Sequence, residues 1–135
     1  MTADNTMPTL GVADLKTHFF TKDGVVKAVD GVSFDVRPGE ILGLVGESGS
    51  GKSITGFSIM RLIDPPGRVV SGRIDFKGQN LLNLDDEGMR AMRGNRIAMI
   101  FQDPMMTLNP VLRVDTQMVE AVQAHRKVDR ATALG

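Results

Sequence analysis

One lysine, three serines and three glycines stand together at residues 46–53, in the stretch "GESGSGKS". This stretch satisfies the pattern G-x-x-x-x-G-K-[ST], whose backbone amides surround nucleotide phosphates in the proteins that carry it. Glycines let backbone N–H groups approach an anion with no Cβ in the way. The pattern therefore predicts a phosphate-binding loop, formed by Gly46, Glu47, Ser48, Gly49, Ser50, Gly51, Lys52, Ser53 and Ile54.

Two side chains of this loop carry specific chemistry. We expect the ammonium of Lys52 to bridge β- and γ-phosphates, and the hydroxyl of Ser53 to bind Mg²⁺. A helix that begins at Gly51 would add the partial positive charge of its N-terminus. The predicted ligand is a nucleoside triphosphate with Mg²⁺, but the loop by itself does not distinguish kinases, GTPases, motor ATPases and transport ATPases.

The residues around the loop predict an α/β fold. Residues 41–45, "ILGLV", are apolar on both faces, which is typical of a central strand in a sheet covered by helices on each side. Apolar residues at roughly helical spacing, which are Ile54, Phe57, Met60 and Ile63, predict a helix that stops at Pro65 and Pro66. A second apolar run, "IAMIF" at 97–101, predicts another buried strand.

The first forty residues favour antiparallel strands. Two strands are predicted on either side of "TKDG", a hairpin turn in which Gly24 can take a positive φ. The second continues through "GVSFDV", where apolar and polar residues alternate, and "RPGE" then predicts a type II turn. Short strands are predicted at 69–81, a short helix at 85–94, and a further helix from Asp115 onward.

The composition limits the classes of function. The 135 residues are enough for one domain, and 16 Lys+Arg balance 16 Asp+Glu, so we expect no nucleic-acid partner attracted by bulk charge. Without cysteine the chain has no disulfide framework and no thiolate metal site. We expect neither a secretory signal nor a membrane span. His18 and His125 have no carboxylate at ligand spacing in the sequence, so we favour packing or surface roles over metal binding.

Three stretches, "AVDGVSFDVRPGEILGLVGESGSGKS", "SGRIDFKGQNLL" and "IAMIFQDPMMTLNP", together resemble the ATP-binding subunits of ABC transporters. They are most similar to the dipeptide, oligopeptide and nickel importer group, and the resemblance runs from about Leu15 to about Ala131. It implies a P-loop nucleotide-binding core with an N-terminal antiparallel β subdomain and the start of a helical subdomain near residue 112. Residues 1–135 would be the N-terminal part of a single nucleotide-binding domain.

The resemblance also implies roles for residues outside the loop. Gln102 would be the Q-loop glutamine, a ligand of Mg²⁺ or of the attacking water, and Lys52 and Gln102 would be the catalytic residues. Gln102 directly follows the predicted strand 97–101, and open α/β sheets bind their ligands at the carboxyl ends of strands. The alternative is that Gln102 is a polar residue that only ends the strand. Phe20 or Phe19 would stack on adenine, with a core role as the alternative for each.

Two further features near Gln102 have alternative interpretations. Asp103 could be a Mg²⁺-binding aspartate at the end of the apolar run 97–101, although "FQDP" fits the Q-loop better. Met105 and Met106, beside the Q-loop, are candidates for contact with a permease.

By this resemblance, the function is to couple ATP binding and hydrolysis to the import of peptides or related solutes. The partners would be ATP, permease subunits and a second ATP-binding subunit, with the protein placed peripherally on the cytoplasmic face of the membrane. The family's signature loop, Walker B strand and switch histidine are not found in the 135 residues, so we expect a poor ATPase. A nucleotide-binding module without turnover is the alternative, and a small-molecule kinase or GTPase is a more distant one.

Overall fold

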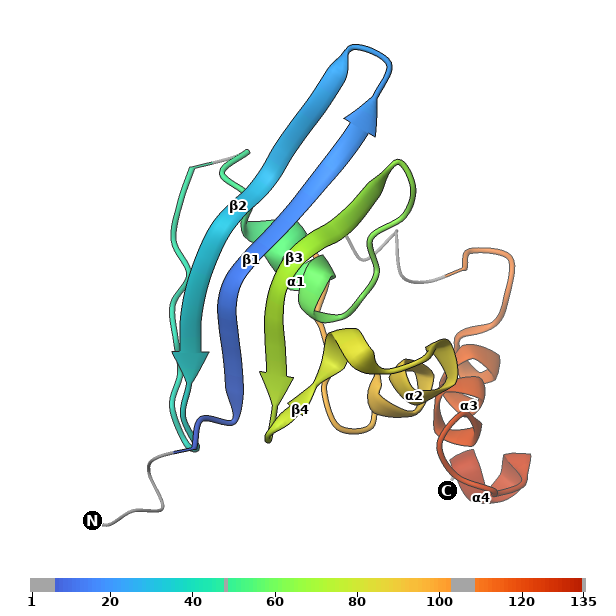
Figure 1. The fold of residues 1–135 in the computed structure, drawn as a ribbon. Helices are drawn as coiled ribbons and strands as arrows, with labels where there is room; N and C mark the ends of the chain where they lie inside the picture. The colour runs from blue at the N-terminus through green and yellow to red at the C-terminus, as the bar shows by residue number, and fades with distance from the viewer. Residues whose placement is uncertain (1–6, 48, 103–108, 135) are drawn as a thin grey trace. The chain divides into compact units, whose positions relative to one another are not determined.

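The computed structural model describes residues 7–47, 49–102 and 109–134, and the chain divides into two compact units, Met1–Met89 and Arg90–Gly135. The first unit contains a four-stranded antiparallel sheet in the order β2-β1-β3-β4 (Figure 1). The strands are β1 (Leu10–Thr21), β2 (Gly24–Val36), β3 (Gly67–Phe76) and β4 (Gln79–Asn80). This sheet matches the antiparallel β subdomain that the sequence predicts.

The hairpin between β1 and β2 forms where the sequence places it. Thr21 pairs with Gly24, whose φ is 130°, and the Thr21 hydroxyl donates a hydrogen bond to the Gly24 carbonyl at 2.7 Å. Along the end of β2, half-buried Val32, Phe34 and Val36 alternate with exposed Gly31, Ser33 and Asp35. The predicted turn at Pro38 and Gly39 also forms, closed by a 3.0 Å hydrogen bond from Glu40 N to Arg37 O.

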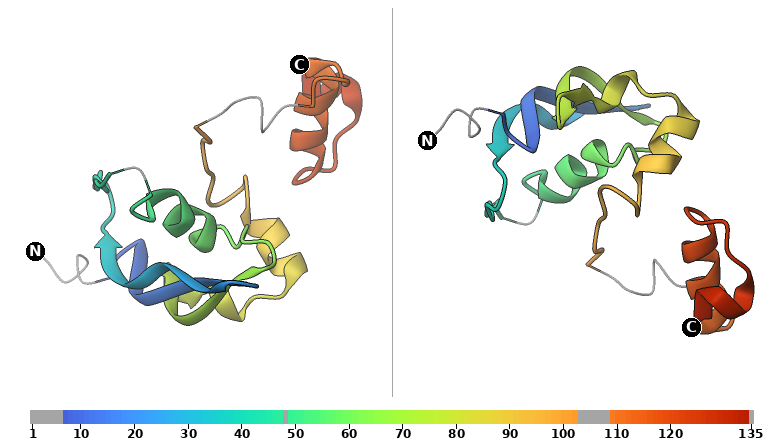
Figure 2. Two further views of the ribbon diagram at one scale, coloured as in Figure 1. Left: turned by 90° about the horizontal axis from the view of Figure 1, so that it is seen from above. Right: turned by 90° about the horizontal axis from the view of Figure 1, so that it is seen from below.

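Helix α1 (Lys52–Ile59) follows the loop and lies against one face of the sheet (Figure 2). It ends before the prolines because Arg61 adopts a left-handed conformation with φ 54°. Two hydrogen bonds close this end, from Arg61 N to Ser58 O at 3.1 Å and from Leu62 N to Phe57 O at 2.8 Å, which is the pattern of a Schellman cap. The Arg61 side chain then donates to the carbonyls of Leu81 and Leu84.

The buried face of α1 is small and polar, which differs from the apolar stripe expected from the sequence. Thr55 and Ser58 are buried, whereas Ile54 and Phe57 are only half-buried. The Ser58 and Thr17 hydroxyls, both on fully buried residues, lie 2.7 Å apart, and Ser58 also donates to the Ile54 carbonyl at 2.7 Å. Small side chains let the helix approach the strands closely, and the paired hydroxyls satisfy each other there.

Replacing Thr17 by valine is expected to lower the free energy of unfolding by ~1–3 kcal/mol. Valine keeps the volume of threonine but leaves the buried Ser58 oxygen without its donor from β1. Urea unfolding followed by circular dichroism measures the change. Thr21→Val, which removes an exposed hydroxyl, is the matched control. An equal loss of stability in both variants would show that the buried hydroxyl pair stabilises the fold no more than an exposed hydroxyl does.

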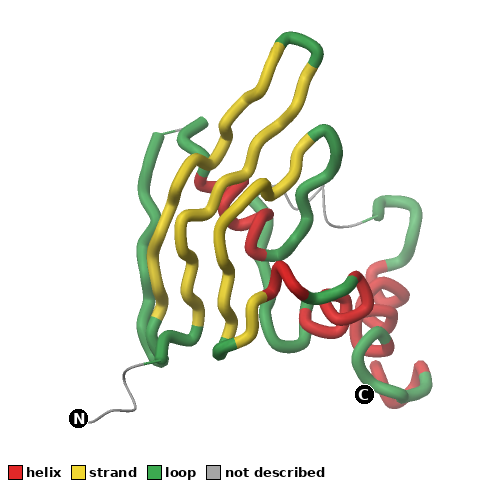
Figure 3. Tube along the Cα trace, in the orientation of Figure 1, coloured by secondary structure: helices red, strands yellow, loops and turns green. Residues whose placement is uncertain are grey.

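The two apolar runs predicted as central strands do not form strands in this structure. Residues 41–45 are unpaired after β2 and are drawn as loop in Figure 3, with Ile41 97% and Val45 91% exposed. In the second unit, Ile97 makes one isolated bridge to Arg93, and Ile100 is 98% exposed. A buried parallel strand needs a neighbouring strand on each edge and a layer of helices on each face. Among the described residues of each unit, no strands or helices cover these two segments in this way.

Shorter elements complete both units. A 3₁₀ helix, η2 (Leu81–Asn83), follows β4, and α2 (Asp86–Met92) agrees with the predicted short helix. The second unit contains α3 (Val114–Gln123) and α4 (Arg130–Leu134). The fully buried apolar side chains of the first unit are Leu15, Ile74, Leu81 and Met89. No helix in the described parts of the chain is long and apolar enough to span a bilayer.

Helix α3 begins at Val114, one residue before the helix start predicted at Asp115, and the helical subdomain beginning near residue 112 stays a prediction. Its N-cap is Arg113, and Asp115 lies in its first turn. The Asp115 carboxylate lies 3.1 Å from the guanidinium groups of both Arg113 and Arg130. Desolvation raises the pKa of this carboxyl, but the two arginines and a backbone hydrogen bond from Thr116 outweigh that effect and lower it.

Candidate nucleotide-binding site

Around the loop predicted to bind phosphate, the described residues combine left-handed glycines with a helix start that has no side-chain cap. Gly49 and Gly51 have positive φ values of 84° and 98°, and a hydrogen bond from Ser50 N to Glu47 O at 3.0 Å closes a turn between them. Gly51 is the N-cap of α1 and makes no side-chain capping hydrogen bond. The first amides of the helix therefore have no capping side chain and can donate to a ligand. Ser48 lies outside the described residues.

Gly51 is required at its position for two independent reasons. Its φ of 98° is in the left-handed region that L side chains rarely adopt. A Cβ at this position would stand 2.6 Å from the Ala28 carbonyl oxygen of β2. The glycine thus lets the start of α1 pack directly on the backbone of β2, which fixes the loop against the sheet.

The Lys52 side chain folds back over the loop. Its ammonium donates hydrogen bonds to the carbonyls of Gly46 and Glu47, the latter at 2.8 Å, and lies 3.4 Å from the Ser50 hydroxyl. A positive charge is therefore held over the loop that leads into α1. Ser53 is exposed in the first turn of the helix, where its hydroxyl is accessible, and Ile54 is half-buried.

The two candidate aromatic residues lie on opposite faces of β1, because successive side chains of a strand alternate. Phe19 packs with Ile63 around Gly67, since a Cβ on Gly67 would stand 2.4 Å from the Phe19 ring and 2.9 Å from Ile63. Thr17, two residues before Phe19 on the same face of β1, has its hydroxyl 2.7 Å from that of Ser58 in α1, so Phe19 lies on the face that α1 covers. Phe20, 40% exposed, instead has its ring 4.7 Å from the guanidinium carbon of Arg68.

The remaining candidates are only partly described. Gln102 is exposed and belongs to the second unit, whereas Asp103, Met105 and Met106 lie outside the described residues. Nε2 of His18 lies 3.6 Å from the Asp30 carboxylate, a neighbour that the sequence reasoning missed because Asp30 comes from the adjacent strand. No group of three or more potential metal-ligating side chains occurs among residues 7–47, 49–102 and 109–134.

Comparisons with known proteins agree with these features. A family model described as "ABC transporter" matches residues 29–134. The probable peptide ABC transporter ATP-binding protein y4tR of Sinorhizobium fredii is 55% identical over 126 residues, which are 93% of this chain and 38% of that protein. The dipeptide transport ATP-binding protein DppD of Bacillus subtilis is 50% identical over 125 residues, 92% of this chain and 37% of that protein.

A solved structure is similar in fold. The ATP-binding cassette MJ0796, determined as a dimer in a post-hydrolysis state with ADP and Pi, has a TM-score of 0.74 at 19% identity, covering 93% of this chain and 54% of that one. The match confirms the predicted α/β P-loop fold. The chain spans a little over a third of the length of the relatives described above.

Proposed function

The chain belongs to the ABC transporter family of ATP-binding proteins, and we propose that residues 46–54 bind ATP with Mg²⁺ to support transport. One observation carries the proposal. A loop with two left-handed glycines leads into a helix N-terminus that has no side-chain cap, and the Lys52 ammonium lies beside it. Backbone donors, a helix dipole and a mobile cation are the features that bind a polyphosphate.

We expect different residues of the loop to contact different parts of the nucleotide. The amides of the first turn of α1 donate to the β-phosphate, and Lys52 exchanges its carbonyl partners for β- and γ-phosphate oxygens. Ser53 would hold Mg²⁺ through its hydroxyl, a hard oxygen donor that suits this ion, and Gln102 is the second ligand that we propose. When bound, Mg²⁺ neutralises charge on the phosphates. Lys52 and Gln102 are the proposed catalytic residues.

We propose Phe19, in preference to Phe20, as the ring that stacks on adenine. Phe19 lies on the sheet face covered by α1, the helix that begins with the phosphate loop. Phe20 lies on the other face, where Arg68 already covers its ring. The position of α1 therefore supports Phe19, and it leaves Phe20 available for another role.

Calorimetric titration with ATP and Mg²⁺ tests both the site and this choice. The chain is expected to bind ATP, and Phe19→Ala is expected to weaken binding by ~5–150-fold, since base–aromatic stacking contributes ~1–3 kcal/mol in other systems. Phe20→Ala is the matched control and should leave ATP affinity within about twofold, because its ring is on the opposite face. Absence of ATP binding by the unmodified chain would refute the proposed function. A larger loss of ATP affinity in Phe20→Ala than in Phe19→Ala would assign the stacking on adenine to Phe20 instead.

We further propose that the transported solutes are peptides or related compounds, imported through permease subunits. The relatives named for peptide and dipeptide transport support this assignment, as does the "FQDPMMTLNP" stretch. The proposed assembly contains a second ATP-binding subunit and lies on the cytoplasmic face of the membrane.

The 135 residues alone are proposed to be a poor ATPase, and phosphate release in the presence of ATP distinguishes slow turnover from binding without turnover.

Gln102→Ala is expected to leave ATP affinity nearly unchanged while lowering peptide uptake per ATP hydrolysed, because a glutamine that positions water and contacts a permease adds little to ground-state binding. The measurement requires the substitution in a complete transporter reconstituted in vesicles. Gln117→Ala, in α3, is the matched control. Unchanged coupling in the Gln102 variant would refute the Q-loop role.

A further inference from the structure

One edge of the sheet is open over part of its length. Strand β3 pairs with β1 from Gly67 to Phe76, but its other edge pairs with β4 only at Asp75 and Phe76. Within the described chain, no strand covers this edge over residues 68–71. An open edge presents a row of backbone N–H and C=O groups that can accept another extended segment.

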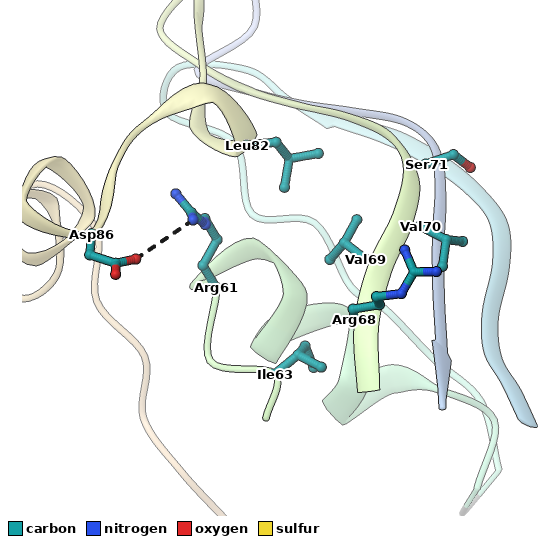
Figure 4. A pocket seen from close by; sticks show the side chains of 8 residues that line it. All are labelled: Arg61, Ile63, Arg68, Val69, Val70, Ser71, Leu82 and Asp86. Atoms are coloured by element: carbon teal, nitrogen blue, oxygen red, sulfur yellow. Dashed lines mark ion pairs between the residues drawn. The ribbon is translucent and has the colours of Figure 1, made fainter. Parts of the chain in front are cut away.

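A cavity of about 480 Å³ lies directly beside this open edge (Figure 4). Its apolar lining includes Ile63, Val69 and Leu82, which come from the segment after α1, from β3 and from η2. The polar residues of the lining include Arg61 and Arg68. An apolar hollow next to unpaired backbone is the arrangement that strand-adding peptides use, with main-chain hydrogen bonds for affinity and a side-chain pocket for specificity.

The two arginines differ in how they are held. Arg61 is fixed by the carbonyls of Leu81 and Leu84, and its Nη2 lies 4.0 Å from the exposed carboxylate of Asp86. Arg68 is exposed and stacks on Phe20, and no carboxylate among the described residues pairs with it. Stacking orients the plane of a guanidinium and leaves its N–H edges free, which is the geometry for a bidentate contact with a carboxylate. Phe20 thereby acquires a role as the platform for Arg68.

We propose that the 68–71 edge of β3 binds an extended segment of a partner protein in which acidic and β-branched apolar residues alternate. The segment adds a strand beside β3, places one apolar side chain in the cavity, and sets a carboxylate against Arg68. The choice of an acidic partner follows from charge, since two arginines and one aspartate line the cavity. This surface is separate from the phosphate loop, so the proposal does not depend on nucleotide binding.

The first test uses three synthetic peptides and the 135-residue chain at low salt. The probe is fluorescein-labelled Val-Glu-Val-Glu-Val-Glu-Val amide, and binding is followed by fluorescence anisotropy. We expect the same peptide with lysine in place of glutamate to bind at least about tenfold more weakly, because Arg68 repels it. A glutamate peptide with N-methylated valines should also bind at least about tenfold more weakly, because its backbone cannot donate to the β3 edge.

The second test uses matched variants of the chain. Arg68→Gln is expected to weaken binding of the glutamate peptide about five- to tenfold, whereas Arg73→Gln should change it less than about twofold. Arg73 is the control because it lies on the same strand, outside the cavity, and pairs with Asp75 at 2.9 Å. Arg68→Lys should recover part of the affinity, and Phe20→Leu should lose part of it by removing the platform.

Several outcomes would overturn the proposal. Equal binding of the glutamate and lysine peptides would refute the acidic partner, and full binding of the N-methylated peptide would refute strand addition. If Arg68→Gln and Arg73→Gln weaken peptide binding equally, Arg68 makes no specific contact with the peptide. If sedimentation shows dimers of the chain that the glutamate peptide dissociates, the edge belongs to a second copy, not to an acidic partner. Circular dichroism melting of each variant confirms that the comparisons are made on folded protein.

Discussion

Lys52→Ala is expected to weaken ATP binding at least ~100-fold, equivalent to ~2.7 kcal/mol. The Lys52 ammonium lies beside the amides that start α1, and charge-assisted hydrogen bonds to two phosphate groups are among the strongest contacts that a side chain can offer. Isothermal titration calorimetry with ATP and Mg²⁺ measures the loss. Binding by the variant within about threefold of the unmodified chain would refute the phosphate-loop assignment.

The same substitution should barely affect the fold. The hydrogen bonds of Lys52 are exposed and local to the loop, so its removal is expected to move the melting temperature by no more than ~3 °C in the absence of nucleotide. Lys22→Ala, at the exposed hairpin turn between β1 and β2, controls for the loss of one positive charge. It should leave both ATP affinity and melting temperature unchanged. A large fall in the melting temperature of Lys52→Ala would instead give this residue a structural role.

Gly51→Ala is expected to lower stability by ~3 kcal/mol and to weaken ATP binding in what remains folded. The added methyl group would meet the Ala28 carbonyl oxygen at 2.6 Å in a conformation with φ 98°, so the loop and the start of α1 must move away from β2. Denaturant unfolding and calorimetric titration measure the two effects. The stability loss and the binding loss should appear together, because one backbone segment carries both.

Gly39→Ala separates the two causes of that effect. Gly39 also has a positive φ, 75°, but a Cβ there would have no atom within 4 Å. It should therefore show only the conformational cost of ~1 kcal/mol, with no change in ATP affinity. If both glycine variants lose the same stability, the contact with Ala28 contributes nothing, and the loop is not anchored to β2 in the way described.

Local patterns made much of the fold predictable. The β1–β2 hairpin, the turn at Pro38 and Gly39, and the helix after the loop depend on contacts between residues close in sequence. Turn residues and the period of hydrophobic residues report such contacts directly. The loop itself was equally clear, because its glycines, lysine and serine have fixed spacing and each residue type has a stated physical use.

Features that depend on distant parts of the chain were not predictable from the sequence. The apolar run 41–45 predicts a buried strand, but a strand is buried only where other strands and helices cover it, and Ile41 is almost fully exposed. The Thr17–Ser58 hydroxyl pair joins residues 41 positions apart. No periodicity in the sequence reports which hydroxyls will meet, so the burial of Thr55 and Ser58 was not predicted, although Met60, at the end of α1, is buried as the apolar spacing indicates.

The sequence by itself determined the family and predicts the chemistry of the phosphate loop, because a nest of backbone amides needs particular residues at particular spacing, whatever surrounds it. Only the tertiary structure decided which phenylalanine faces α1, and which edge of the sheet stays open beside Arg68. Those outcomes depend on how β1, β3 and α1 pack, and packing is set by contacts between residues far apart along the chain.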